Sequence, residues 1–309
     1  MRFVAGLDGG GTKTKVAIAD ESGRMAETFT LGPINYNGQD ERVVERTIEE
    51  IVARIGRVCG SLEHCVHLCL GAAGISAAGV AERLTAAIRN AGYQGGLTLA
   101  GDHETALYGA LSQPHGIILV AGTGSICFGR NEQGCTHRTG GFGHLIDDEG
   151  SGYSIGRQLL SALVQASDGR IPPTVISQRI YETLQLPNDS LREVIGFVYD
   201  PRRTKKDIAA LAPILSEACS VGDIAALNIA RHSADALFEL LAPVAECLDL
   251  QSGHLALAGS VLLQNRFIQS SLRERIAASC PGLSCTLPEH DAAWGAMMMA
   301  WHYYSDVHH

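Results

Sequence analysis

The chain has 309 residues, of which 46% are hydrophobic and 18% charged, and its 24 Lys and Arg against 33 Asp and Glu give a formal net charge of −9. This hydrophobic fraction excludes intrinsic disorder, and a negative net charge without any basic block argues against nucleic acid or an anionic membrane as the main partner. The length suggests about two domains, since a typical domain has ~150 residues.

The sequence has the features of a cytoplasmic protein. The apolar run from Met1 to Leu7 ends at Asp8, far short of a signal-peptide core, and the longest apolar stretches have the length of strands, too short to cross a bilayer. The nine cysteines are an odd number and contain no Cys-x-x-Cys pair. We therefore expect a reduced protein without a disulfide framework.

Strand patterns and helix patterns alternate along the first third of the chain. The first three β-rich runs follow each other across short turns, which predicts an antiparallel meander, and apolar residues near a 3.6-residue period predict the helices. The expected strands cover residues 2–7, 14–20, 25–31, 64–70 and 97–100, and the expected helices cover 40–58 and 77–90.

A second block begins near Gln113–Gly116, where a helix ends and a new strand, glycine-rich turn and strand follow. The remaining elements are expected as strands at 117–120, 126–130, 255–258 and 283–287, mostly helix from 151, a long helix at 224–248 and a closing helix from 291. Alternating strands and helices predict an α/β protein. We expect one domain at 1–115, completed by the helix 291–309, and a second at 116–290.

Two glycine-rich turns occupy corresponding positions in the two halves, which indicates a weak internal repeat. The first contains Gly9-Gly10-Gly11-Thr12-Lys13 and the second Gly122-Thr123-Gly124-Ser125. Glycine accepts positive φ and has no Cβ, so the N–H groups of such turns can converge on phosphate oxygens, to which the threonines add hydroxyl donors. Neither turn has the P-loop spacing or leads from a strand directly into a helix. The alternative is a pair of ordinary tight hairpins.

Asp8 ends the first predicted strand, immediately before the first glycine-rich turn. Mg²⁺ prefers one or two carboxylates together with water and substrate phosphates. Asp8 is therefore the candidate metal ligand, and the alternative is a turn-forming aspartate.

The two turns together resemble the phosphate motifs of the actin-like, sugar-kinase and Hsp70 ATPase superfamily. Further segments resemble its BadF/BadG/BcrA/BcrD ATPase family, which includes N-acetylglucosamine kinases, glucosamine kinases and archaeal hexokinases. These segments are Gly32-Pro33-Ile34-Asn35, Ala100-Gly101-Asp102, and the stretch from Gly140 to Tyr153. The resemblance runs from Phe3 to about Gly295 and implies two actin-like (ribonuclease H-like) domains, each a mixed sheet flanked by helices, with a cleft between them.

The resemblance also implies roles for individual residues. Asp102 would be the general base and would contact the sugar, with His103 expected to point elsewhere; a helix-capping role for Asp102 is the alternative. Asn37 competes with Asn35 as the sugar-binding amide. The implied ATP ligands are Asp8, Gly9, Gly10, Gly11, Thr12, Lys13, Gly122, Thr123, Gly124, Ser125, Gly259 and Ser260, and the implied sugar ligands are Asn35, Gly141, Phe142, Gly143 and Asp148.

The sequence departs from the family pattern at two positions in the glycine-rich sugar loop. Related kinases often have Trp at the position of Phe142 and Gly at the position of Asp147. We hypothesise that the additional carboxylate of Asp147 favours a free amine over an acetamide on the sugar.

One cysteine and histidine pattern suggests a metal site. Cys65, His67 and Cys69 alternate along a predicted strand and are expected to share one face of it. No fourth ligand is evident, so core packing is the preferred interpretation.

The expected function is that of an ATP-dependent kinase that transfers the γ-phosphate to the 6-hydroxyl of an amino sugar, with N-acetylglucosamine as the first candidate. A glucosamine kinase and a broad-specificity hexokinase are alternatives. ATP and Mg²⁺ are the expected cofactors, a small sugar is the expected partner, and we expect a homodimer.

The alternative of another class is an ATPase that activates a dehydratase or reductase through an iron–sulfur cluster bridging a dimer. Cys127 and Cys135 do not match the cysteine pattern that such an activator needs.

Overall fold

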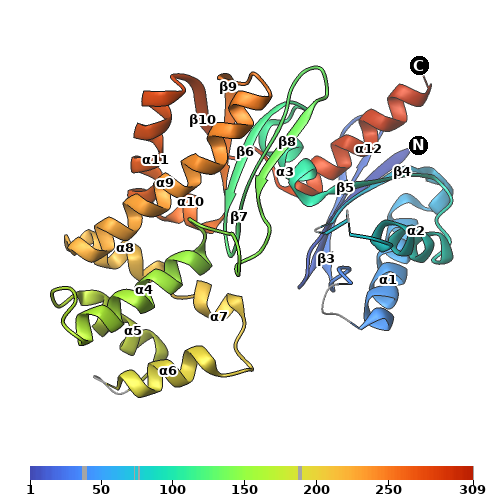
Figure 1. Ribbon diagram of the computed structural model, residues 1–309. Coiled ribbons are helices and arrows are strands. Elements are labelled where there is room, and N and C mark those ends of the chain that lie inside the picture. Colours follow the sequence, from blue (N-terminus) through green and yellow to red (C-terminus); the bar gives the residue numbers. More distant parts are fainter. Residues whose placement is uncertain (37–39, 73, 76, 187–189, 309) are drawn as a thin grey trace. The chain divides into compact units, whose positions relative to one another are not determined.

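A computed structural model covers the chain and describes residues 1–36, 40–72, 74–75, 77–186 and 190–308 (Figure 1). It divides into a first unit, Met1–His115 with Pro288–His309, and a second unit, Gly116–Leu287. Residues 288–290 lie with the first unit, where the N–H groups of Glu289 and His290 donate to the carbonyls of Ala110 and Gly109, both at 3.0 Å.

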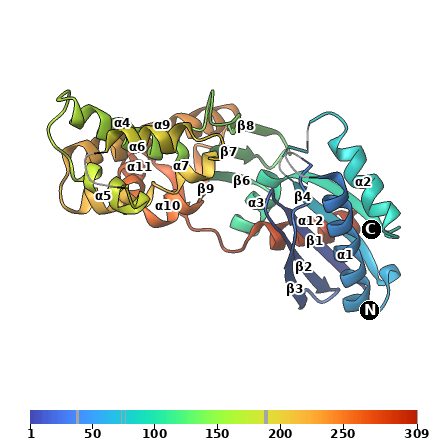
Figure 2. The same ribbon diagram turned by 90° about the horizontal axis from the view of Figure 1, so that it is seen from below.

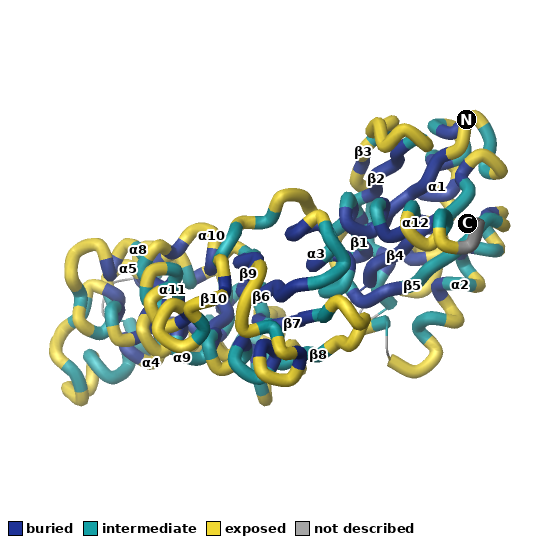
Figure 3. Tube along the Cα trace, turned by 90° about the horizontal axis from the view of Figure 1, so that it is seen from above, coloured by how far each residue is buried: buried dark blue, intermediate teal, exposed yellow. Residues whose placement is uncertain are grey.

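The first unit is built on a five-stranded mixed sheet in the order β3-β2-β1-β4-β5. β1 pairs antiparallel with β2 and parallel with β4, which makes it the central strand, and Figure 3 shows it as buried. The strands are β1 (Phe3–Gly9), β2 (Thr14–Asp20), β3 (Met25–Leu31), β4 (Cys65–Ala72) and β5 (Gly96–Gly101), and the helices are α1 (Glu41–Cys59), η1 (Leu62–His64), α2 (Val80–Asn90), α3 (Asp102–Leu111) and α12 (Ala292–His308).

Helices cover both faces of this sheet (Figures 1 and 2). On one face, the apolar stripe of α1 packs with α2 against the side chains of Phe3, Ala5 and Leu7. α1 begins where the Asp40 side chain accepts the Arg42 N–H and ends at Gly60 in the left-handed conformation. On the other face, small side chains of the strands pack against α12.

The expectation that Cys65, His67 and Cys69 share one face is wrong for Cys65. Cys65 packs in the core beneath α1, whereas Cys69 packs against α12. The cause is an irregularity in the ladder, where Phe3 pairs with Cys65 but the next residue, Val4, pairs with His67. One extra residue in β4 reverses the alternation of its side chains. The described residues contain no cluster of three or more potential metal-binding His, Cys, Asp or Glu side chains.

The second unit repeats this topology. Its sheet order is β10-β9-β6-β7-β8, with β6 antiparallel to β7 and parallel to β9, so β6 corresponds to β1. β8 was not predicted from the sequence. The strands are β6 (Gly116–Ala121), β7 (Ser125–Arg130), β8 (Thr136–Gly140), β9 (Ser252–Ala258) and β10 (Gly282–Thr286).

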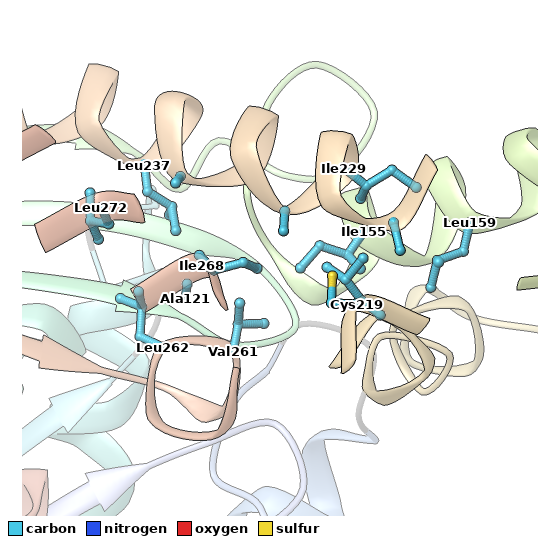
Figure 4. Packing of buried hydrophobic residues seen from close by; sticks show 14 of the residues in the cluster. Ala121, Ile155, Leu159, Cys219, Ile229, Leu237, Val261, Leu262, Ile268 and Leu272 are labelled. Atoms are coloured by element: carbon cyan, nitrogen blue, oxygen red, sulfur yellow. The ribbon is translucent and has the colours of Figure 1, made fainter. Parts of the chain in front are cut away.

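Eight helices described in this unit build most of its hydrophobic core. Figure 4 shows Ile155, Ile229 and Val261 from three of these helices within this core, together with Ala121 of β6. The helices are α4 (Gly152–Ser167), α5 (Val175–Leu184), α6 (Leu191–Tyr199), α7 (Lys205–Ala209), α8 (Pro213–Ser220), α9 (Ile224–Cys247), α10 (Ser260–Gln264) and α11 (Arg266–Ser279).

Two mixed sheets flanked by helices confirm the predicted α/β fold class. Within the described part of the chain, we find no helix whose length and apolar character would suffice to span a bilayer.

Two helical glycines provide a matched test of the packing between α12 and α3. A Cβ on Gly295 would lie 2.0 Å from the carbonyl oxygen of Thr105 and 2.5 Å from the nitrogen of Gly109, whereas a Cβ on Gly196 in α6 would meet nothing within 4 Å. We expect Gly295→Ala to destabilise the protein by about 2–3 kcal/mol, because the clash is with backbone atoms. Gly196→Ala should be neutral or stabilise by about 0.5–1 kcal/mol. Urea unfolding of both variants measures the difference, and equal effects would contradict this packing.

Candidate active site

The first glycine-rich turn joins β1 to β2 and is closed by a bond from the Gly10 N–H to the Lys13 carbonyl at 3.1 Å. The expectation of positive φ is wrong here, since none of the glycines of this turn has one, nor have Gly122 and Gly124 of the second turn. The space around the backbone explains glycine better, at least at Gly9, where a side chain would clash. A Cβ on Gly9 would lie 2.8 Å from the Ile34 side chain, whereas nothing stands within 4 Å of the corresponding position at Gly11.

Asp8 lies at the end of β1 in an acidic surrounding. Burial raises the pKa of its carboxyl, and the carboxylates of Asp102 and Asp291 raise it further, against the opposing charges of Lys15 and Lys13. Lys15 is engaged by Asp291, with Nζ 2.5 Å from Oδ2. A largely buried carboxylate whose ionisation is opposed by other carboxylates gains from a bound cation, and oxygen is the ligand that Mg²⁺ prefers. Asp8 therefore fits Mg²⁺, which takes few protein ligands and completes its shell with phosphate and water.

Asp102 is the first residue of α3, directly after β5. The capping bond of this helix comes from Glu104, whose Oε1 accepts the Gly101 N–H at 2.9 Å. The Asp102 carboxylate accepts the His103 N–H at 3.0 Å and remains 48% exposed. The expectation that His103 points elsewhere is wrong, because its Nδ1 lies 3.4 Å from Asp102 Oδ1.

Asn35 lies in a segment that is tied down on both sides. Before it, Thr14 Oγ1 donates to the Gly32 carbonyl at 2.8 Å, and the Ile34 side chain is fully buried in the core next to Gly9. After it, the Tyr36 ring lies beneath the Arg83 guanidinium at 3.8 Å. Asn35 is thus held beside the first turn. Asn37 lies outside the described residues.

The second glycine-rich turn joins β6 to β7 and offers fewer donors than the sequence suggests. The Gly122 N–H donates to the Gly124 carbonyl at 2.9 Å, and the Ser125 N–H donates to Asp148 Oδ1 at 3.2 Å. Among the described residues, the N–H groups of Thr123 and Gly124 have no hydrogen-bond partner. These two can bind an anion without breaking the turn.

Asp148 is joined to this turn. It has a φ of 65°, is only 3% exposed, and would lie 2.8 Å from a Cβ on Gly124. The Ser125 hydroxyl donates to the neighbouring Glu149 carbonyl at 2.7 Å. The end of the predicted sugar loop and the second turn therefore form one hydrogen-bonded structure.

The remaining predicted sugar-loop residues, Gly141 to Gly143, come earlier in the same loop, which folds back on itself. Gly141 and Gly143 have positive φ, and Phe142 between them is 61% exposed, with its ring 4.6 Å from the Arg138 guanidinium. Asp147 Oδ2 accepts the Phe142 N–H at 3.0 Å. The carboxylate that we associated with amine selectivity thus holds the loop backbone.

A pocket of about 290 Å³ in the second unit begins at the second turn. Ser260, at the start of α10, lines it as the sequence suggested, and Gly259 before it has a φ of 86° and would place a Cβ 2.4 Å from the Ala121 carbonyl. Sequence reasoning named Gly122, Thr123 and Ser260 and missed the other eleven lining residues, although the small side chains of Ala209, Ala210 and Ala212 were an available signal. The lining residues are Gly122, Thr123, Gly152, Ile155, Lys206, Ala209, Ala210, Ala212, Pro213, Ser216, Ser260, Val261, Gln264 and Asn265.

Comparison with known proteins places the chain among sugar kinases and related ATPases. It is 33% identical to an N-acetylmuramic acid/N-acetylglucosamine kinase of Clostridium acetobutylicum, with 97% of this chain and 98% of that protein covered. It is 28% identical to an N-acetyl-D-glucosamine kinase of Dictyostelium discoideum, with 96% of each covered.

A solved structure has the same fold. It is a Chromobacterium violaceum protein assigned as an N-acetylglucosamine kinase, with a TM-score of 0.76, 22% identity, and coverage of 97% of this chain and 99% of that one. The sequence profile of the BadF/BadG/BcrA/BcrD ATPase family matches residues 5–300. The chain therefore belongs to the BadF/BadG/BcrA/BcrD ATPase family.

Proposed function

We propose that the protein is an ATP-dependent kinase that transfers the γ-phosphate to the 6-hydroxyl of an amino sugar, with N-acetylglucosamine as the preferred acceptor. The observation that carries this proposal is the identity of 33% over almost the whole length of a kinase of that class. The pocket that connects Gly122 and Thr123 with Ser260 supports it, because a nucleoside beside a phosphate-binding turn is what such a kinase needs.

In this proposal five of the predicted residues have separate tasks. The N–H groups of Thr123 and Gly124 bind phosphate oxygens, and Asn35 binds sugar hydroxyls through its amide. Asp102 accepts the proton of the attacking hydroxyl as the general base. Asp8 would hold Mg²⁺, which neutralises phosphate charge when it is bound. His103 keeps the Asp102 carboxylate in place through the 3.4 Å contact.

The burial of Cys127 argues against the activator alternative. Cys127 is fully buried in the core of the second unit, where burial raises the pKa of its thiol, so it cannot reach a cluster shared with another subunit. Cys135 is exposed on the connection between β7 and β8. All nine cysteines are free thiols, which also supports a cytoplasmic location. The homodimer stays a prediction.

Coupled ADP release over a panel of sugars tests the proposed activity. The panel contains N-acetylglucosamine, glucosamine, N-acetylmannosamine, muramic acid and glucose, with buffer alone as the control for ATP hydrolysis. We expect the highest kcat/KM with N-acetylglucosamine and glucosamine as the next best acceptor. A rate with every sugar equal to the rate in buffer would contradict the kinase.

A further inference from the structure

The pocket of the second unit is lined by an amide side chain whose oxygen is hydrogen-bonded and whose nitrogen is not. Asn265 stands between α10 and α11, lines the pocket, and is 5% exposed. Its Oδ1 accepts the N–H groups of Phe267 and Ile268, each at 3.1 Å. Because both partners are donors, this atom must be the amide oxygen, and the orientation of the amide is fixed.

The other end of this amide is a donor without a partner. Among the described residues, Asn265 Nδ2 makes no hydrogen bond. Every fully buried side-chain nitrogen or oxygen in the described structure has a hydrogen-bond partner. Because Nδ2 has none, it is not fully buried and keeps some accessible surface. The surface that this nearly buried side chain retains therefore opens into the pocket that it lines. An NH2 group held in this way is ready to bind an acceptor without loss of side-chain freedom.

The surroundings indicate which part of a nucleotide this donor would meet. Thr123, whose N–H group binds phosphate in the proposed function, lines the pocket together with its neighbour Gly122. Much of the remaining lining is apolar. It includes Val261, whose carbonyl accepts the Asn265 N–H at 3.0 Å, and the alanines and the proline of 209–213. Small-molecule pockets of this kind combine apolar walls with a few placed polar groups that fix the orientation of the ligand.

We propose that Asn265 is a nucleotide-positioning residue whose Nδ2 donates to a ring nitrogen or ribose oxygen of the nucleoside of bound ATP. This inference rests on the proposed ATP-dependent function. The same side chain then has two roles: its oxygen caps the N-terminus of α11, and its nitrogen donates a hydrogen bond that orients the nucleotide.

Asn265→Asp separates these two duties. Aspartate keeps an acceptor for the two backbone N–H groups, as aspartate and asparagine are equally good helix caps, but it replaces the donor by an oxygen. We expect KM for ATP to rise about tenfold, with kcat and KM for the sugar within about twofold and the urea midpoint unchanged. Asn265→Ser also caps the helix, carries no charge and is too short to reach, so it should raise KM for ATP similarly.

The control is the same change at a matched position away from the pocket. Asn131 Oδ1 accepts the Cys135 N–H at 2.9 Å in the β7–β8 connection, so Asn131→Asp also exchanges only an NH2 group for oxygen. We expect its KM for ATP to stay within about twofold of the natural protein. Inorganic triphosphate serves as a competitor that lacks the nucleoside, and its inhibition constant should be the same in all variants.

The outcomes distinguish the two proposals. An unchanged KM for ATP in both folded Asn265 variants overturns the positioning role, and so does a parallel loss of triphosphate affinity, which would place the effect at the phosphates. Calorimetric titration with ATP alone gives the independent measurement. A natural protein that binds ATP more tightly than its Asn265 variants, yet phosphorylates no sugar, would support this inference and refute the kinase activity.

Discussion

We expect Asp102→Asn to lower kcat for sugar phosphorylation by about 10²–10⁴-fold, the range for loss of a general base. The amide keeps the shape of the side chain and its acceptor oxygen for the His103 N–H, which Asp102 now binds at 3.0 Å. KM for ATP and for the sugar should therefore change little. Stability should fall by at most about 1 kcal/mol, since the substitution removes a negative charge from the first turn of α3. Steady-state kinetics by ADP release provides the measurement.

Glu104→Gln is the matched control for this variant. It removes a carboxylate from the same helix turn and retains an acceptor oxygen for the Gly101 N–H, which Glu104 binds at 2.9 Å. We expect its kcat to stay within about twofold of the natural protein. If Asp102→Asn also retained nearly full turnover, the proton would be accepted by another group.

Asp8→Asn is expected to weaken activity and to strengthen the fold. Burial and the neighbouring carboxylates of Asp102 and Asp291 raise the pKa of Asp8, so its ionised form costs free energy in the folded protein. In metal-free buffer, the neutral amide should raise the free energy of unfolding by on the order of 1 kcal/mol. The same change should lower kcat/KM for Mg²⁺-ATP by about 10²–10³-fold, because it removes the carboxylate that we propose to hold the metal.

Asp291→Asn provides a control with the opposite sign. Burial opposes the ionisation of Asp291, but hydrogen bonds from Lys15 and from the Trp294 N–H outweigh this and hold the pKa of its carboxyl below its usual range. Its ionised form therefore stabilises the fold, and the amide should lower the free energy of unfolding. Urea unfolding of the two variants side by side would refute the electrostatic assignment if both moved in the same direction.

Local patterns in the sequence predicted the parts of the site that local chemistry determines. A glycine-rich turn between two β-rich runs specifies a hairpin, and both hairpins are present at the predicted residues. Asp102 follows a short apolar run and lies where a strand meets a helix. Each of these expectations depends on residues within about one strand length of each other, the range over which periodicity carries information.

Features that depend on contacts between distant segments could not be predicted in this way. The pocket brings residues 206–216 together with 260–265, and no periodic pattern connects those segments. The reversal of side-chain direction near Cys65 depends on how β4 pairs with β1. The bond from the Phe142 N–H to Asp147 likewise arises from the folding of the loop on itself, which turned a presumed ligand into a support for the backbone.

The place of α12 has a consequence for the order in which the protein is made. The face of the first sheet formed by Val4, Ala17, Ala19 and Cys69 is covered by Ala293, Met297 and their neighbours on α12. The ribosome synthesises those residues after the whole of Gly116–Leu287. Until α12 has been synthesised, this apolar face of the first sheet has no helix to cover it. By then all strands of the second sheet have already been synthesised. All of the second unit is thus available to fold before α12 has been synthesised, and the first unit can bury both faces of its sheet only after α12 has left the exit tunnel.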